Sequence, residues 1–335
     1  MSMTRKQFLT GAVAAAGALA APPVIAAPRT VIHLGHGLAP EHVGAVHIAA
    51  AAQKIKSLTN GEVEVLVFPS SQLGDDTHMM SNLRSGAMEI LFTGDNILSS
   101  MVPAAAIDNI GFAFKSADIA WKALDGKVGD MVSAEFEKAG LHPMRRIWDE
   151  GFREITSSMK PIRTPEDLHG FKIRVPASPI ELAMFQALGA APLTVNLAEA
   201  YTALQTHVAD GQENPLGMIE TQKFYQVQKY CTLTNHIWVG HWLLANGAFW
   251  AGMPAEHRKI VEETFNAQAL EERVANQKAD ASLEEVLTRH GMEFIKPDLS
   301  LFQAALTKSG FYKTWQGKFG APLWAALESY TGQLA

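Results

Sequence analysis

Residues 171–181 read F-K-I-R-V-P-A-S-P-I-E, and this stretch decides the fold. From 171 to 175 apolar and basic residues alternate, which is the period of a strand with one buried face. Pro176 cannot donate to a neighbouring strand, so the strand should end there. Ser178 as N-cap, with proline next and glutamate three residues later, predicts a helix start. We therefore expect Arg174 at the carboxyl end of a strand, directly before a helix N-terminus.

The following residues repeat this strand–helix pattern. Residues 193–195 can form a strand, 198–205 a helix, and 211–214 a further strand that leads into a helix opened by proline. In open α/β sheets, ligands bind beyond the carboxyl ends of the strands. A guanidinium at that edge, beside a helix N-terminus, makes a site for an anion, most naturally a carboxylate. Arg174 is therefore the central candidate for ligand binding.

The N-terminal half shows the same alternation. Strands are expected at 30–34, 62–68 and 88–93, with helices over 40–58 and from 75 onward. This βαβαβ order is typical of an α/β fold with a mostly parallel sheet. Four polar residues stand at strand ends or helix starts, where a first domain would line a cleft: His36, Asp76, Asp95 and Asn96.

Two further stretches concern how the parts are joined. Residues 141–148 predict a strand that leads into D-E-G-F-R at 149–153. Residues 255–290 contain neither Gly nor Pro, and apolar residues recur there at roughly helical spacing. A single helix over most of this stretch would be about 50 Å long, which is more than one small domain needs, so it could brace two domains. The alternative is two helices broken near 280–282.

Residues 1–27 read as an export signal. Arg5 and Lys6 precede an Ala/Gly/Val-rich run that ends in small residues, where cleavage is expected. A membrane anchor is the alternative, because the uncharged run is about long enough to cross a bilayer. Alanine is only weakly apolar, however, and Pro22-Pro23 interrupts the run. Residues 4–9 resemble the twin-arginine export motif with Lys in place of the second Arg, which leaves the export route open.

Charge and composition argue against several functions. The chain has 28 Lys and Arg against 34 Asp and Glu, a net charge of −6. This argues against nucleic acid as a partner, since phosphate binding requires a basic face. Cys231 is the only cysteine, so no internal disulfide can form, and we expect it to be a small packed residue. Hydrolase, zinc-protease, phosphate-loop and dinucleotide motifs are absent, and His36, His42 and His47 lack a metal-ligand spacing. The sequence predicts no enzyme, cofactor or metal.

Several short motifs together resemble a known family. They are G-F-R, K-P-I-x-T-P-E-D-L-x-G-x-K-I-R-V-P, L-G-A-x-P, E-x-Y-x-A-L-Q and D-G-Q-E-N-P within residues 151–215, joined by F-P-S-S-Q-L-G-D at 68–75 and T-N-H at 234–236. In this order they are similar to the DctP-type solute-binding subunits of tripartite ATP-independent periplasmic (TRAP) transporters. The resemblance covers nearly the whole chain after the signal. It implies a two-lobe periplasmic-binding-protein fold, with a ligand cleft between the lobes and a long helix spanning both.

The resemblance also assigns roles to three residues. Arg174 would form the salt bridge with the ligand carboxylate, whereas the residues alone also allow an internal pair with Glu181 or Asp167. Arg153 matches the family's second arginine near the carboxylate, with a solvated loop arginine as the alternative. Asn214 could simply cap the helix that follows it, but in the family the corresponding asparagine points toward the ligand.

Specificity for one ligand over another is expected to come from positions that are less uniform among members of the family. The further candidates for ligand contact are Glu213, Trp148, Asp149, His36, Asp76, Asp95, Asn96, Ser178, Trp238 and His241. Asp76, Asp95 and Ser178 fall near ligand-lining positions of the sialic-acid-binding members, whereas Asp149 in W-D-E-G-F-R looks more like members that bind dicarboxylates. Glu213 could equally be structural or contact a hydroxyl. Pocket carboxylates would suit a ligand with hydroxyls, because ionised Asp only accepts hydrogen bonds, and they would repel a second carboxylate unless another cation balanced it.

We therefore predict an exported, periplasmic, monomeric two-domain protein. The first domain would comprise 28–151 plus 240–279, and the second 152–239 plus 280–335. The protein would capture a small organic acid, C4-dicarboxylate-like or a sugar or hydroxy acid, between lobes that close by hinge motion. In the family, the ligand passes to one small and one large membrane subunit driven by a sodium gradient. The alternatives are presentation of the ligand to a membrane sensor, or a periplasmic enzyme acting on a carboxylate.

Overall fold

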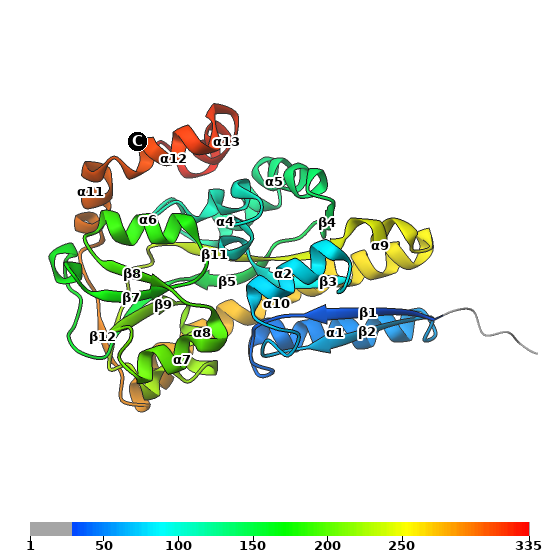
Figure 1. Ribbon diagram of the computed structural model, residues 1–335, viewed down its shortest axis with the longest axis horizontal. Coiled ribbons are helices and arrows are strands. Elements are labelled where there is room, and N and C mark those ends of the chain that lie inside the picture. Colours follow the sequence, from blue (N-terminus) through cyan, green and yellow to red (C-terminus); the bar gives the residue numbers. More distant parts are fainter. Residues whose placement is uncertain (1–28, 335) are drawn as a thin grey trace, which may run out of the picture.

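The computed structural model describes residues 29–334, which form two six-stranded sheets with helices around them (Figure 1). The predicted export signal, residues 1–27, lies outside the described residues. Among the helices of residues 29–334, none combines the length and the apolar character needed to cross a membrane.

The first sheet is built mainly from the N-terminal half of the chain. Its strands are β1 (Thr30–Gly35), β2 (Val63–Phe68), β3 (Ile90–Gly94), β4 (Leu141–Pro143), β5 (Trp148–Phe152) and β11 (Trp238–Asn246). The order is β2-β1-β3-β11-β4, and β5 also pairs with β11. β1 runs parallel to β2 and β3, as the βαβαβ pattern predicts, while β11 returns antiparallel beside β3.

The second sheet follows the pattern expected around residues 171–181. Its strands are β6 (Glu154–Ser157), β7 (Lys172–Val175), β8 (Ala191–Thr194), β9 (Gly211–Asn214), β10 (Tyr230–Thr232) and β12 (Glu293–Ile295), in the order β12-β10-β6-β9-β7-β8. Parallel neighbours flank β7 on both sides. Arg174 is in β7, and the Ser178 side chain accepts a hydrogen bond from the Glu181 backbone to cap α6 (Pro179–Ala187). The predicted strand end and helix start are confirmed.

The remaining helices of the two parts connect their strands. Beside the first sheet are α1 (Val43–Leu58), α2 (Asp76–Ser85), α3 (Asp95–Leu98), α4 (Ala117–Leu124), α5 (Lys127–Lys138) and α9 (Gly247–Gly252). Beside the second are α7 (Leu197–Gln205) and α8 (Leu216–Thr221). The 3-10 helices are η1 (Pro103–Asn109), η2 (Pro165–Leu168) and η3 (Phe224–Gln226). Helix α1 begins later than residue 40 because the His42 ring accepts a hydrogen bond from the Gly44 backbone and so acts as the N-cap.

The single strand expected over 141–148 is wrong, because the structure has the two short strands β4 and β5 instead. Between them, the Arg146 backbone N–H donates to Asn266 Oδ1 (3.0 Å), and the Ile147 carbonyl accepts from Arg273 Nε (3.0 Å). Both partners belong to α10 (Ala255–Arg289). A helix more than 100 residues away thus takes the hydrogen bonds that a neighbouring strand would have taken.

The prediction of one long helix is confirmed, and the alternative of two broken helices is wrong. Helix α10 runs without interruption for 35 residues. It contacts α1 and β5 on the side of the first sheet and α8 and β12 on the side of the second. In Figure 1 it passes from the first sheet to the lower edge of the second. The helix therefore braces both sheets.

The chain passes between the sheets three times, once through α10 and twice through short segments that touch each other. One lies between β5 and β6 and contains Arg153, and the other joins β10 to β11. The Arg153 backbone N–H donates to the Ile237 carbonyl at 2.9 Å, which ties the two segments together. These crossovers set the boundary between the halves, and they place Arg153 at its centre.

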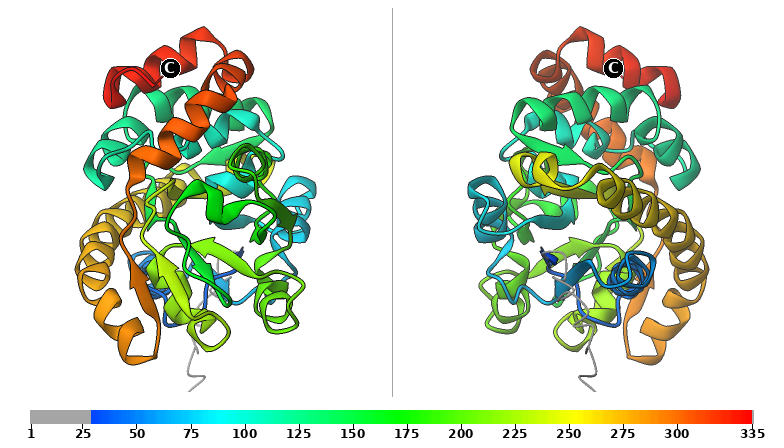
Figure 2. Two further views of the ribbon diagram at one scale, coloured as in Figure 1. Left: turned by 90° about the vertical axis from the view of Figure 1, so that its left-hand side faces the viewer. Right: turned by 90° about the vertical axis from the view of Figure 1, so that its right-hand side faces the viewer.

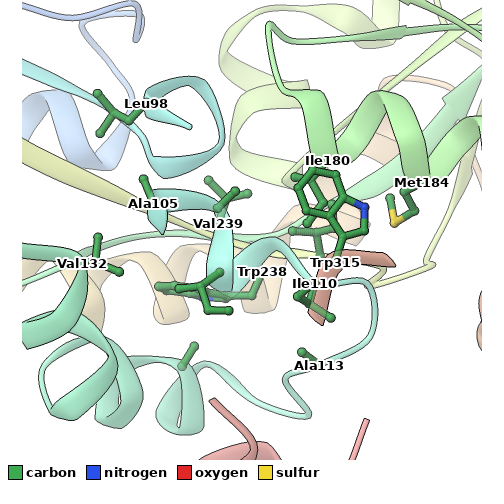
Figure 3. Packing of buried hydrophobic residues seen from close by; sticks show 14 of the residues in the cluster. Leu98, Ala105, Ile110, Ala113, Val132, Ile180, Met184, Trp238, Val239 and Trp315 are labelled. Atoms are coloured by element: carbon green, nitrogen blue, oxygen red, sulfur yellow. The ribbon is translucent and has the colours of Figure 1, made fainter. Parts of the chain in front are cut away.

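The C-terminal helices are α11 (Leu299–Ser309), α12 (Phe311–Phe319) and α13 (Ala321–Thr331), and they pack on both halves. Helices α11 and α12 contact α6, whereas α13 contacts α4 and α5, as Figure 2 shows at the top of the molecule. A continuous buried cluster runs through this region. Figure 3 shows Trp238 of β11, Ile180 and Met184 of α6 and Trp315 of α12 within it.

Candidate functional site

A small cavity lies between the two sheets, beside the crossover at Arg153. Its volume is about 30 Å³, room for one or two water molecules. Apolar walls are formed by Leu38, Phe92, Leu197 and Met218. The polar and charged lining comes from both halves and consists of Asp76, Asn96, Glu150, Arg153, Arg174, Asn214 and His241.

Arg174 reaches this cavity from the end of β7 and is 1% exposed. Its Nε donates to the Val195 carbonyl at 2.8 Å, which fixes the plane of the guanidinium. Among residues 29–334, no Asp or Glu forms an ion pair with it, and its two terminal nitrogens form no hydrogen bond there. Burial lowers the pKa of Arg174 to about 10, because the nearby charges of Glu213 and Asp76 offset the lost hydration only in part. The internal pairs with Glu181 and Asp167 that the sequence left open are not formed.

Arg153 lines the same cavity but is fully engaged by the protein. Its Nε and Nη2 donate to the Glu213 carboxylate at 2.5 and 2.9 Å, and Nη2 also donates to the Glu213 carbonyl at 2.8 Å. Nη1 lies 3.4 Å from Glu150 Oε2. Burial alone would lower the pKa of Arg153, but the carboxylates of Glu213, Glu181 and Glu150 raise it above the usual range. Glu213, which the sequence left undecided, is thus a structural partner of Arg153.

The Arg153–Glu213 pair extends into a buried chain of hydrogen bonds. His236 Nε2 lies 3.2 Å from Glu213 Oε2, and its Nδ1 lies 2.8 Å from the Thr234 hydroxyl. Burial alone would raise the pKa of Glu213, but Arg153 lowers it to about 2. Each polar atom of this chain meets a partner, so the chain fixes the crossover rather than offering a place for a ligand.

Asn214 presents one end of its amide to the cavity. Its Nδ2 donates to Gln212 Oε1 (2.5 Å), and Gln212 in turn donates to the Thr156 hydroxyl (3.0 Å). This leaves the Asn214 side-chain oxygen without a hydrogen bond from any described residue. The site therefore offers an acceptor here, and the second N–H of the Asn214 amide also forms no hydrogen bond with a described residue.

Three further side chains face the cavity without strong partners. Asp76 is the first residue of α2, is 4% exposed, and its carboxylate accepts no hydrogen bond within residues 29–334. Burial raises the pKa of Asp76 to about 6 and that of Glu150 to about 7. His241 stacks on Phe92, with ring centroids 4.7 Å apart, and burial lowers the pKa of its ring well below the usual value. His241 is therefore neutral near pH 7.

One hydrogen bond crosses the gap between the halves. Asn96 Nδ2, on α3, donates to Glu181 Oε1, on α6, at 2.7 Å. The second oxygen of Glu181 is buried without a partner in the described part of the chain. Burial, followed by the neighbouring charge of Glu213, raises the pKa of Glu181 well above its usual value. The side-chain nitrogen of Asn96 is therefore hydrogen-bonded to the opposite half.

Several sequence candidates lie behind the cavity wall instead. Asp149 accepts hydrogen bonds from Trp238 Nε1 (2.7 Å) and Asn276 Nδ2 (3.1 Å). Asp95 accepts from Asn109 Nδ2 (2.9 Å) and from the Gly240 backbone (2.8 Å). Both carboxylates are thus hydrogen-bonded within the protein. The remaining candidates outside the lining are Trp148, which packs edge-on against Phe92, His36, which lies near the same ring, Ser178, which caps α6, and Trp238.

The sequence analysis missed Glu150, Glu181 and His236. Glu150 faces the cavity because β5 contains a bulge: Gly151 pairs with Val239 and Asp149 with Gly240, which leaves Glu150 without a partner on β11. Gly151 adopts φ 110°, a conformation that glycine reaches without strain. The W-D-E-G sequence is a usable signal for such a bulge, but it does not say which acid turns inward. Residues 29–334 hold no group of three His, Cys, Asp or Glu side chains placed to bind a metal ion.

Comparisons with known proteins agree on one family. The family described as "Bacterial extracellular solute-binding protein, family 7" (DctP) matches residues 34–312. The C4-dicarboxylate-binding periplasmic protein DctP of Rhodobacter capsulatus is 32% identical, and the match covers 97% of each chain. The 2,3-diketo-L-gulonate-binding periplasmic protein YiaO of Escherichia coli is 36% identical over 64% of this chain and 66% of that one.

Coverage differs among the other matches. The uncharacterized protein y4mM of Sinorhizobium fredii is 38% identical, but this chain spans only 44% of its length. A TRAP periplasmic solute-binding protein from Sulfurospirillum deleyianum, solved with bound succinate, superposes with a TM-score of 0.86. It is 29% identical, and the match covers 91% of this chain and 100% of that one. The overall fold is thus shared with a TRAP solute-binding protein that was solved with succinate bound.

Proposed function

This chain belongs to family 7 of the bacterial extracellular solute-binding proteins, and we propose that it captures a small organic acid between its two sheets, with the acid's carboxylate bound to Arg174. The observation that carries the proposal is the state of that side chain. Arg174 is buried and lines the cavity, and no carboxylate of the described residues pairs with it. Burying an unpaired cation is costly, and an incoming anion removes that cost.

The geometry of Arg174 suits a carboxylate. The Nε bond to Val195 holds the guanidinium in one plane, with both terminal nitrogens free to donate. A planar fork of this kind binds a carboxylate through two parallel hydrogen bonds, each worth about 1.5–3 kcal/mol. The Asn214 oxygen and Arg153 lie on the same cavity and would border the bound group. Lysine would keep the charge but lose the second bond.

Entry of such an acid requires the halves to move apart. About 30 Å³ is too little for an acid of several carbon atoms. The apolar wall is shared, with Leu38 from the first half and Leu197 and Met218 from the second, and the Asn96–Glu181 bond crosses the gap. Opening would part these contacts, and closing over the ligand would restore them, as in hinge-type binding proteins.

Family membership supports a proposal for the biological task. We propose that the protein works in the periplasm as a monomer and passes its ligand to the small and large membrane subunits of a TRAP transporter. Relatives are named as periplasmic proteins that bind C4-dicarboxylates or 2,3-diketo-L-gulonate. We propose no catalytic step, because the family to which the chain belongs is one of solute-binding proteins.

Thermal unfolding of the purified protein with a library of organic acids tests the proposal, since a ligand that binds only the folded state raises the melting temperature. The best ligand should lose well over tenfold in affinity in Arg174→Ala, and less in Arg174→Lys. Arg163→Ala, which removes an exposed arginine, is the matched control and should bind like the wild type. Wild-type affinity in both Arg174 variants would place the site elsewhere.

A further inference from the structure

Beyond Arg174, the cavity is lined by several side chains whose oxygen atoms can accept hydrogen bonds. Asp76 and Glu150 are 4% and 6% exposed. Asp76 accepts no hydrogen bond from residues 29–334, and the one recorded side-chain bond of Glu150 is the long contact of 3.4 Å to Arg153. Asn214 lines the cavity, its Nδ2 donates one hydrogen bond to Gln212, and its side-chain oxygen accepts none from residues 29–334. Away from Arg174, the site therefore offers mainly hydrogen-bond acceptors.

Donors and positive charge are scarce in the same region. Arg153 already donates to both carboxylate oxygens of Glu213 and to its carbonyl. Asn96 donates to Glu181 at 2.7 Å. His241 is a neutral ring, with one donor and one acceptor nitrogen. A second carboxylate on the ligand would thus meet two buried acids and no cation without an internal partner.

We propose that the natural ligand is a monocarboxylic acid whose remaining carbon chain carries hydroxyl groups, with its carboxylate on Arg174 and its hydroxyls donating to Asp76, Glu150 and the Asn214 oxygen. The inference rests on the proposed function and names the substrate class of the same site. A hydroxyl both donates and accepts, so it satisfies buried carboxylates that have no other donor. A second ligand carboxylate beside these acids would be disfavoured by like-charge repulsion.

Matched four-carbon acids separate these classes by calorimetric titration of the purified protein. Succinate carries two carboxylates, butyrate carries one carboxylate and no hydroxyl, and erythronate and threonate carry one carboxylate and three hydroxyls. Five- and six-carbon aldonates extend the hydroxylated set. We expect the best hydroxy acid to bind at least tenfold more tightly than succinate or butyrate, because neither of these supplies donors to Asp76 and Glu150.

A substitution in the acceptor wall sharpens the test. Asp76→Asn should weaken binding of the best hydroxy acid by tenfold or more, and should leave succinate binding unchanged or improved. Asp75→Asn is the matched control: it makes the same change one residue away, outside the cavity lining, and asparagine still caps α2. The control should change affinity by less than twofold.

The outcomes distinguish this inference from the proposed function. If succinate, butyrate or an amino acid binds the wild type more tightly than every hydroxy acid, the inference is overturned, while acid capture by Arg174 stands. Equal losses of hydroxy-acid binding in the Asp75 and Asp76 variants would also overturn it. If no acid binds at all, the proposed function falls, and this inference falls with it.

Discussion

The two buried arginines of the cavity show how differently one side chain can be used. Arg153 and Arg174 are 2% and 1% exposed, and both line the same space. Arg153 is held by Glu213 and lies near Glu150, and these carboxylates raise its pKa. Arg174 has one carbonyl partner, and burial lowers its pKa. Burial alone therefore does not distinguish the two arginines. The lack of an internal counter-charge does, and the proposed binding role of Arg174 rests on it.

The largest effect should come from removing the arginine that the protein itself uses. Arg153→Met leaves Glu213 buried with 0% exposure and without its counter-charge, which should cost about 3–5 kcal/mol of unfolding free energy. Arg174→Met should cost about 1 kcal/mol or less in the absence of ligand, because it removes a cation that has no ion-pair partner. Urea denaturation measures both. Equal losses in the two variants would contradict the division of roles.

The comparison of paired and unpaired charges extends to the carboxylates. The next largest change in unfolding free energy should come from the titration of Asp76. Its pKa is about 6 in the folded protein against 3.8 in the unfolded chain, so the native state binds the proton more tightly. Stability should fall as the pH rises from about 4 to 6 and then stay lower, because one pKa unit is worth about 1.4 kcal/mol.

Asp76→Asn removes the loss of stability that results when the buried Asp76 carboxyl ionises. At pH 7.5 we expect the variant to be more stable than the wild type by about 3 kcal/mol, and at pH 3.5 the difference should vanish, as measured by urea denaturation at each pH. Asp75→Asn serves again as the control for a carboxylate outside the cavity lining. A stability gain that is the same at both pH values would show that Asp76 is not the titrating group.

Features that depend on neighbouring residues could be predicted from the sequence, whereas features that depend on distant residues could not. The position of Arg174 at the end of β7 and the Ser178 cap follow from neighbouring residues, and both were predictable. The break between β4 and β5 depends on Arg273, 126 residues away from Ile147. The engagement of Arg153 depends on Glu213, 60 residues away, which the sequence analysis named but could not pair.

The acids of the cavity illustrate the same limit. Asp149 and Glu150 are neighbours with the same chemistry, and a strand turns consecutive side chains to opposite faces. Local pattern cannot decide which face is the cavity. The bulge in β5 sends Glu150 inward, while Trp238 and Asn276 hold Asp149 on the other side. The sequence therefore located the segment, while Glu150 rather than Asp149 lines the cavity of this structure.

The smallest expected effect concerns Glu181, which lies beside Glu213 and differs from it in charge. Burial and the charge of Glu213 raise the pKa of Glu181 well above its usual value, which favours the neutral form of this side chain. Glu181→Gln replaces a neutral acid by a neutral amide that still accepts from Asn96, and should change unfolding free energy by less than about 0.5 kcal/mol. Glu213→Gln removes the ionised partner of Arg153 and should cost several times more. If urea denaturation gives equal costs for the two variants, the buried negative charge is shared between the two acids, and Arg153 is not paired with Glu213 alone.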